Sequence, residues 1–212
     1  EFDFPQNLIS EDLRYGENPH QRGILLKSNL NYGVANSIKL SGKKMSYNNY
    51  LDADVAFTAS HYFEKNSVAI VKHSNVCGLS VNDNQVDAFK AALDGDPISA
   101  YGGIIGFNTM VKEEAAKEIV KNFFEIIIAP KFDKKSLLIL KSKKNLRIIE
   151  AKFKNDEGLL FRSISGGILA QSHNIDEDYD LDIVTEKKPD YEQLSDLKFA
   201  WNLCLFIKSN SI

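Results

Sequence analysis

Short runs dominated by apolar residues alternate with helical patterns along the 212-residue chain. Runs of strand length lie at Val68–Val71, Ile104–Phe107, Ile126–Ala129 and Leu146–Glu150. Continuous apolar runs of this length are typical of strands that are covered on both faces of a sheet. Pro130 directly follows the third run and ends it, because proline has no N–H to donate to a neighbouring strand. The pattern therefore predicts buried strands at these four places.

Between these runs, apolar residues recur at the spacing of one helix face. This spacing predicts helices over residues 47–65, 85–94, 112–124 and 133–141, and from about 190 to 209. Asn48 or Asn49 is expected to cap the first helix, and Thr109 to cap the third. Glu113 and Glu114 would then lie near the positive end of the third helix dipole.

The alternation of strands and helices predicts an α/β fold with three layers, in which helices cover both faces of a central sheet. Near residues 152–158 the apolar periodicity lapses and the charge rises. We therefore predict one unit over residues 1–155, and the beginning of a second unit over residues 156–212.

Composition narrows the classes of function. The chain is 43% hydrophobic and 26% charged, with a net charge of −3, so it has no basic surface of the kind that binds nucleic acid. No apolar run reaches the roughly 20 residues of a membrane span. The two cysteines, Cys77 and Cys204, are far apart in sequence, which argues against a disulfide framework and a cysteine-rich zinc site. We expect a cytoplasmic protein that needs no metal.

Two adjacent basic side chains, Lys72 and His73, follow the apolar run Val68–Val71. In an open parallel sheet, ligands gather at the carboxyl ends of the strands, where these two residues would lie. A histidine there can take a proton from a reacting nitrogen, and a neighbouring ammonium can stabilise negative charge on an oxygen. A histidine that only caps the next turn fits the same residues, so both interpretations stay open.

The motif LRYGENPHQ, residues 13–21, is too polar for the core of a strand. Its glycine, asparagine and proline favour a tight turn, from which Arg14 and Tyr15 can reach an anion and a planar ring. The same composition is typical of an ordinary surface turn.

Glycine pairs occur at Gly102-Gly103 and at Gly166-Gly167, each after small hydroxylated residues. Such pairs allow close backbone approach to a ligand, but they also occur in bulges and strand turns. Neither pair matches the GxGxxG or GxxxxGK[ST] patterns, so the usual fingerprints of dinucleotide and ATP sites are missing.

Seven ordered motifs together resemble the aminoimidazole carboxamide ribonucleotide (AICAR) transformylase region of the bifunctional purine biosynthesis enzymes. They extend from residue 13 to residue 212: LRYGENPHQ, KKMSYNNYLDADVA, AIVKHSNVCG, DPISAYGGIIGFN, EIIIAP, RSISGGILAQ and FIKSNSI. The resemblance implies two similar units of cytidine-deaminase-like fold. It does not imply deaminase chemistry, since the chain lacks the H-x-E and P-C-x-x-C zinc ligands.

The resemblance implies formyl transfer from 10-formyltetrahydrofolate, a cosubstrate, to the 5-amino group of AICAR, a step in IMP biosynthesis. His73 matches the base that takes the amine proton, and Lys72 matches a cation that stabilises the developing oxyanion. Asn210 matches an amide beside the reacting amine. By the same matching, four residues fall where the family binds the nucleotide: Arg14, Tyr15, Gly102 and Glu125, the last at the ribose.

The resemblance further implies a homodimer with a shared active site, an IMP cyclohydrolase activity elsewhere in the protein, and no prosthetic group. It allows a monovalent cation near the final motif. Val76-Cys77 stand where many family members have proline, which changes the stiffness of the turn but removes no catalytic group. Because the family has further site residues beyond the final motif, we expect the chain to be inactive by itself.

Two other classes of function fit parts of the same pattern. In a nucleotide-binding module, Lys72 and His73 would hold phosphate without moving protons. In an oligomerisation scaffold, the apolar face of the last helix would form an interface.

Overall fold

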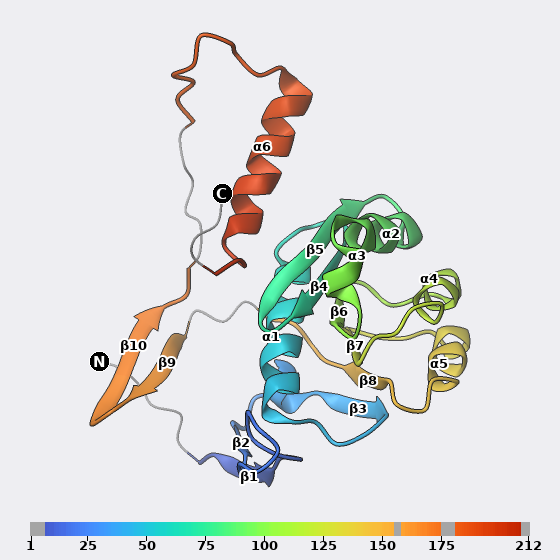
Figure 1. Cartoon of the computed structure of the whole chain (residues 1–212), viewed down its shortest axis with the longest axis vertical. Helices are drawn as coiled ribbons and strands as arrows, with labels where there is room; N and C mark the ends of the chain where they lie inside the picture. Colours follow the sequence, from blue (N-terminus) through green and yellow to red (C-terminus); the bar gives the residue numbers. More distant parts are fainter. Residues whose placement is uncertain (1–6, 155–157, 175–180, 209–212) are drawn as a thin grey trace. The chain divides into compact units, whose positions relative to one another are not determined.

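The computed structural model describes residues 7–154, 158–174 and 181–208, which fall into two units, Glu1–Lys154 and Asn155–Ile212. A six-stranded sheet organises the first unit (Figure 1). Its strands, in spatial order, are β3 (Ile38–Ser41), β8 (Arg147–Glu150), β7 (Ile126–Ala129), β6 (Ile104–Phe107), β4 (Asn66–Lys72) and β5 (Asn75–Asn82). The predicted strands at 104–107 and 126–129 have the bounds observed for β6 and β7.

The sheet is mixed, which corrects the expectation of a parallel sheet around Lys72. Strands β6, β7 and β8 are parallel to one another, whereas β4 runs antiparallel to both β5 and β6. Strand β3 pairs antiparallel with β8. The end of β4 therefore lies beside the beginning of β6, and Lys72 is at the edge where the three parallel strands start.

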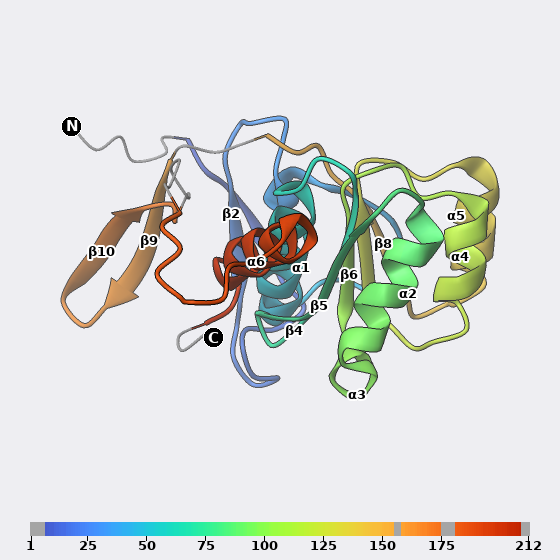
Figure 2. The ribbon, with the colours of Figure 1, turned by 90° about the horizontal axis from the view of Figure 1, so that it is seen from above.

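Helices cover both faces of this sheet (Figure 2). Helix α1 (Tyr47–His61) lies on one face, and α2 (Gln85–Gly95), α4 (Glu113–Ile119) and α5 (Lys134–Lys141) lie on the other. Side chains alternate between these layers along each strand. In β7, Ile126 and Ile128 belong to the core under α1, while Ile127 and Ala129 belong to the opposite core. The predicted α/β fold with helices on both faces is therefore observed.

Two predicted helix caps are wrong. Helix α1 begins after Ser46, whose hydroxyl accepts from the Asn49 N–H, while the Asn49 side chain accepts from the Ser46 N–H. This capping box satisfies two N–H groups at once, which a cap at Asn48 or Asn49 would not do. Helix α4 begins after Lys112 and ends at Ile119. Thr109 instead bridges Gln85 and Asn66 through its hydroxyl.

Strand β5 was not predicted, because its residues alternate less regularly and it begins directly after the turn at Ser74. Gly78 on this strand lies against α2. A Cβ atom at Gly78 would stand 1.9 Å from the carbonyl oxygen of Ala92. Gly106 on β6 has the same relation to α1, at 2.2 Å from the carbonyl oxygen of Ala56. Because Gly78 and Gly106 have no side chain, α2 and α1 can pack closely on opposite faces of the sheet.

Smaller elements complete the first unit: the hairpin of β1 (Ile9–Asp12) and β2 (Ile24–Lys27), the 3-10 helix η1 (Val34–Asn36), and the single-turn helix α3 (Pro97–Ala100). The hairpin is bound to the start of α1, since the Arg14 N–H donates to the Met45 carbonyl at 2.9 Å.

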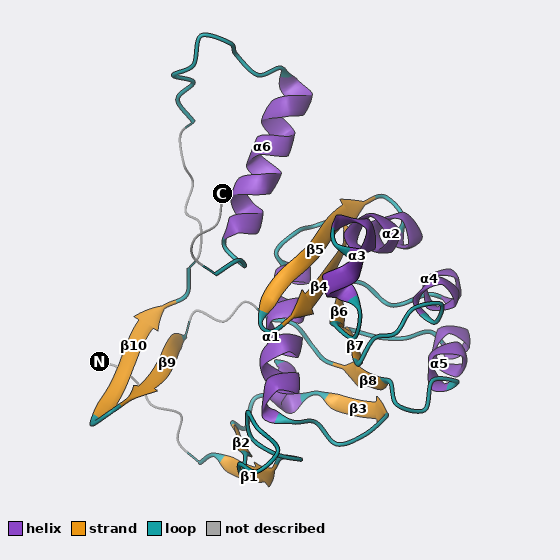
Figure 3. Ribbon diagram, in the orientation of Figure 1, coloured by secondary structure: helices purple, strands orange, loops and turns teal. Residues whose placement is uncertain are grey.

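The second unit contains the hairpin of β9 (Leu159–Ile164) and β10 (Gly167–Ser172), and helix α6 (Tyr191–Cys204), as Figure 3 shows. Gly166 occupies the hairpin turn with φ +80°, so the strand-turn interpretation of this glycine pair is confirmed. Asp190 caps α6 through a second capping box, close to the predicted start. No helix within the described ranges is both long and apolar enough to cross a membrane.

We expect His61, at the end of α1, to make stability depend on pH. Its ring stacks on Phe153 with centroids 4.3 Å apart, and burial lowers its pKa from 6.5 to about 4. The unfolded chain therefore takes up a proton between these values that the folded chain does not. The free energy of unfolding is therefore highest, as far as His61 determines it, above about pH 6.5. It falls as the pH drops towards 4, by at most about 3 kcal/mol.

Urea unfolding followed by circular dichroism from pH 7.5 to pH 4 would measure this loss. The variant His61→Phe keeps a stacking ring without a titrating group, so its stability should fall less over the same range. Equal pH dependence in both proteins would contradict the assignment.

Gly106→Ala should destabilise the first unit by about 3 kcal/mol or more, because the added methyl overlaps the backbone of α1 rather than a movable side chain. Gly95→Ala is the matched control. A Cβ at Gly95 meets its nearest atoms at 3.7 Å, and alanine favours the helix. Urea midpoints measure both effects, and equal midpoints would mean that α1 does not pack this closely on β6.

Candidate functional site

One edge of the central sheet collects most of the predicted site residues. The pairing register runs across it from Val71 to Ile104, then to Ile126, then to Arg147. The loops next to this row are joined by backbone hydrogen bonds: Gly102 N–H to Phe123 O at 2.8 Å, Glu125 N–H to Gly103 O at 3.0 Å, and Arg147 N–H to Glu125 O at 3.0 Å. Lys72, Gly102 and Glu125 therefore stand on one connected strip of backbone.

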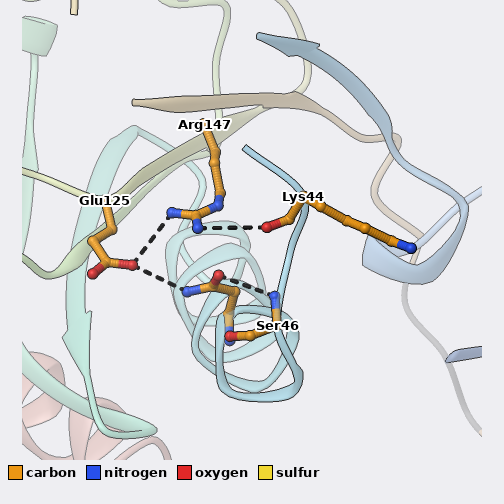
Figure 4. Close-up of polar contacts among 5 residues, drawn as sticks. Lys44, Ser46, Glu125 and Arg147 are labelled. Carbon is orange, nitrogen blue, oxygen red and sulfur yellow. Dashed lines mark hydrogen bonds and ion pairs between the residues drawn. The ribbon is translucent and has the colours of Figure 1, made fainter. Parts of the chain in front are cut away.

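Glu125 is held by two donors from different elements (Figure 4). The Asn49 amide donates to Oε2 at 3.2 Å, and the Arg147 guanidinium donates to the same oxygen at 3.3 Å. The Glu125 side chain is 45% exposed, whereas that of Arg147 is 5% exposed. Both donors use Oε2, and neither of them contacts the other carboxylate oxygen (Figure 4), which leaves that oxygen to accept from a hydroxyl-bearing ligand.

Arg147 is the polar member of a row that otherwise faces the core under α1. Burial lowers the pKa of its guanidinium, and the Glu125 carboxylate opposes that shift. The Arg147 Nη2 atom lies 3.5 Å from the Lys44 carbonyl, while Nε has no hydrogen-bond partner among the described residues. An arginine keeps its charge even here, so Arg147 presents a fixed positive charge behind Glu125.

Arg14 and Tyr15 enter from the loop after β1. The Tyr47 N–H donates to the Tyr15 carbonyl at 3.1 Å, which ties the loop to the start of α1. The Arg14 guanidinium carbon lies 5.2 Å from the centre of the Tyr15 ring, and Arg14 is exposed. Arg14 lowers the pKa of Arg147, and Tyr15 raises it. The motif lies in a surface turn, as one interpretation had it, and it also brings Arg14 and Tyr15 near enough to Arg147 to act on its pKa.

Lys72 and His73 end β4 at a two-residue turn. Lys72 pairs with Asn75, and the two residues between them, His73 and Ser74, have φ of 55° and 56°. The Lys72 ammonium donates to the Tyr101 carbonyl at 2.7 Å, directly before Gly102. The His73 side chain is exposed, while its N–H donates to the Asp52 carboxylate on α1 at 3.2 Å.

Gly102 has φ +72°, a conformation that side-chain-bearing residues rarely adopt. A Cβ at its neighbour Gly103 would lie 2.9 Å from the Val71 carbonyl oxygen. Gly102 is thus required by its backbone conformation, and Gly103 by the close approach of the loop to the end of β4. The approach of this glycine pair to a ligand stays a prediction.

A pocket of about 540 Å³ lies between the ends of α4 and α5. It is lined by residues such as Tyr101, Phe123 and Leu146, together with several lysines. None of the predicted site residues lines it, so we do not take it for the site.

Three residues that bind the predicted site residues were not predicted from the sequence. Asn49 and Arg147 donate to Glu125, and Asp52 accepts from the His73 N–H. The signal for Arg147 was its place directly before Ile148 and Ile149, in a strand whose first three side chains are buried. Asn210, predicted to act beside the amine, lies outside the described residues. Across the described part of the chain, no three His, Cys, Asp or Glu side chains are grouped as metal ligands.

Comparison with known proteins agrees with the resemblance. Residues 3–212 match the family model described as AICARFT/IMPCHase bienzyme. Proteins named bifunctional purine biosynthesis protein PurH are similar: 39% identical over 207 residues in Thermoanaerobacter sp. (strain X514), 42% over 204 in Aquifex aeolicus (strain VF5), and 43% over 219 in Buchnera aphidicola subsp. Schizaphis graminum (strain Sg).

These matches cover 96%, 95% and 99% of the chain, and 41%, 40% and 42% of the respective relatives. The chain thus spans about two fifths of the length of the curated relatives it matches. It belongs to the AICARFT/IMPCHase bienzyme family.

Proposed function

We propose that the chain forms part of an AICAR formyltransferase, which transfers the formyl group of 10-formyltetrahydrofolate to the 5-amino group of AICAR in purine biosynthesis. The observation that carries this proposal is the sheet edge at which Lys72, Gly102 and Glu125 are linked through the loops that precede β6 and β7. Membership of the family, whose relatives are named as purine biosynthesis proteins, supports the same assignment.

In the proposed reaction, the amine nitrogen of AICAR attacks the formyl carbon. The amine is a poor nucleophile because its lone pair is conjugated with the imidazole and the carboxamide. His73 takes its proton as the new C–N bond forms, and the Lys72 ammonium stabilises the negative charge on the formyl oxygen. Collapse of the tetrahedral intermediate breaks the bond to N10 of the folate, which leaves as tetrahydrofolate once N10 is protonated.

The geometry of Lys72 and Glu125 suits these roles. One N–H of the Lys72 ammonium is used by the Tyr101 carbonyl at 2.7 Å, which fixes the cation and leaves two donors for the oxyanion. The outward oxygen of Glu125 suits the ribose hydroxyls, and Arg14 with Tyr15 suits the phosphate and the base. Asn210 would act beside the amine.

The full protein would work as a cytoplasmic homodimer with a shared active site, and the units of the chain would have the cytidine-deaminase-like fold. We further propose that ring closure by an IMP cyclohydrolase activity takes place elsewhere in the protein. The transfer itself would use no metal or prosthetic group, although a monovalent cation near Asn210 is compatible with it. Since the chain spans about two fifths of its relatives, residues 1–212 alone would not catalyse the transfer.

In the full-length protein, His73→Ala should slow single-turnover formyl transfer by about 10²- to 10⁴-fold, the usual contribution of a general base. Lys72→Met should cost at least as much. Nucleotide affinity, measured by calorimetry, should change little in either variant.

The control His173→Ala removes a histidine of the second unit and should keep the wild-type rate. A wild-type rate in either His73→Ala or Lys72→Met would overturn the proposal. Lost nucleotide affinity with an unchanged rate of transfer from the bound complex would favour a role in holding phosphate.

Arg147→Met should weaken nucleotide binding about tenfold, or about 1.4 kcal/mol, because Glu125 loses one of the two donors that orient it. The half-exposed carboxylate can be hydrated, so the fold should survive. Lys65→Met is the control, since it breaks an ion pair with Asp83 whose side chains are 67% and 87% exposed and such pairs contribute little. Unchanged affinity in Arg147→Met would show that Arg147 has a structural role only.

A further inference from the structure

The carboxylate of Asp52 binds the turn that carries His73. Asp52 lies on α1, and its Oδ1 accepts from the Ser74 N–H at 2.6 Å and from the Ser74 hydroxyl at 3.1 Å. Its Oδ2 accepts from the His73 N–H at 3.2 Å. One side chain therefore satisfies three donors from two consecutive residues.

This turn is of a kind that its own sequence does not favour. Two-residue hairpin turns with both φ values positive are dominated by Asn-Gly and similar pairs. Here the two positions are His73 and Ser74, with φ of 55° and 56°. Residues with side chains persist in the left-handed region only where their surroundings hold them there. The three hydrogen bonds to Asp52 are the contacts that hold this turn.

We propose that Asp52 is a positioning residue for formyl transfer, which acts by fixing the left-handed turn that aims the His73 imidazole. This inference rests on the proposed function, in which His73 accepts the amine proton. The φ of His73 sets the direction of its Cα–Cβ bond, so a turn that relaxes to negative φ changes the direction in which the imidazole points. A misplacement of about 1 Å can cost about a hundredfold in rate.

The same helix face also holds Glu125. Asn49 and Asp52 are three residues apart, so they lie side by side on α1. Asn49 donates to Glu125, and Asp52 accepts from the turn of His73. Side chains of one helix, α1, therefore hold both the turn of His73 and the proposed ribose-binding carboxylate of Glu125. This shared attachment fixes their relative positions.

The test uses the full-length enzyme with Asp52→Asn, which keeps the size of the side chain. The amide N–H₂ replaces one carboxylate oxygen, so it meets a backbone N–H whose hydrogen bond it cannot accept. The expected result is a loss of kcat by about tenfold to a hundredfold, with the KM for AICAR within about threefold. Asp94→Asn, an exposed carboxylate on α2, is the matched control and should keep the wild-type kcat. Urea unfolding establishes that each variant is folded.

Two further variants separate positioning from general stability. Ser74→Gly in the Asp52→Asn background should recover part of kcat, because glycine adopts positive φ without strain. In the His73→Ala background, Asp52→Asn should change kcat by less than about twofold, because the residue that it positions is already gone.

An equal loss of kcat from Asp52→Asn with and without His73 would overturn the role of Asp52, and so would a wild-type kcat in Asp52→Asn alone. If Asp52→Asn does not fold, Ser74→Gly and the cycle with His73→Ala are repeated with Asp52→Ser, to which the same outcomes apply. A wild-type rate in His73→Ala would instead overturn the proposed function. The two failures are therefore distinguishable.

Discussion

The hydrogen bonds from the first two turns of helix α1 are the constraint on which the site depends. Asn49 both closes the capping box of the helix and donates to Glu125. Asp52, less than one turn later, accepts from His73 and Ser74. Because α1 is buried against the sheet through Ala53, Ala56 and Phe57, the packing of the core fixes the backbone from which these polar side chains extend. The packing of α1 on the sheet thus determines where Asn49 and Asp52 lie.

The direction of β4 decides which groups can meet. If β4 were parallel to β6, Lys72 would lie at the opposite edge from Glu125, at the far ends of the strands. The antiparallel pairing of Val71 with Ile104 instead places Lys72 beside the loop at Gly102. The hairpin turn needed to reverse the chain after Lys72 then becomes the place from which His73 is presented. The antiparallel direction of β4 thus accounts both for the position of Lys72 near Gly102 and for the turn that carries His73.

The part of the fold that follows from local pattern was predictable, and the part that follows from tertiary contacts was not. Strands β6 and β7 are uniformly apolar, so their bounds could be read directly. Strand β5 is half-buried from Val76 to Asn82, and the turn before it lacks the glycine that usually marks a hairpin, so it was not predicted. Nothing in a single segment encodes whether β4 pairs parallel or antiparallel, since that depends on its partner.

The candidate site divides in the same way. Residues proposed to face a ligand, such as Lys72 and Glu125, were predicted from motifs carried by the resemblance. The residues proposed to position them were not predicted, because each one also fits an ordinary structural role in its own segment of the sequence. Asn49 and Asp52 look like polar positions of an amphipathic helix, and Arg147 looks like the end of a basic run. Only the fold shows that they point at the same edge.

Backbone strain is concentrated where these groups converge. Among the described residues, the side-chain-bearing positions with positive φ are Asn7, His73 and Ser74, and Gly102 lies beside the same edge with φ +72°. Such conformations cost free energy at His73 and Ser74, which carry side chains, so they persist there only where surrounding contacts determine them. At this edge the contacts are present: a carboxylate under the turn, and a Phe123 carbonyl accepting from Gly102. The strain is therefore held by the same interactions that orient the polar groups, which is the arrangement expected where precise geometry matters more than local stability.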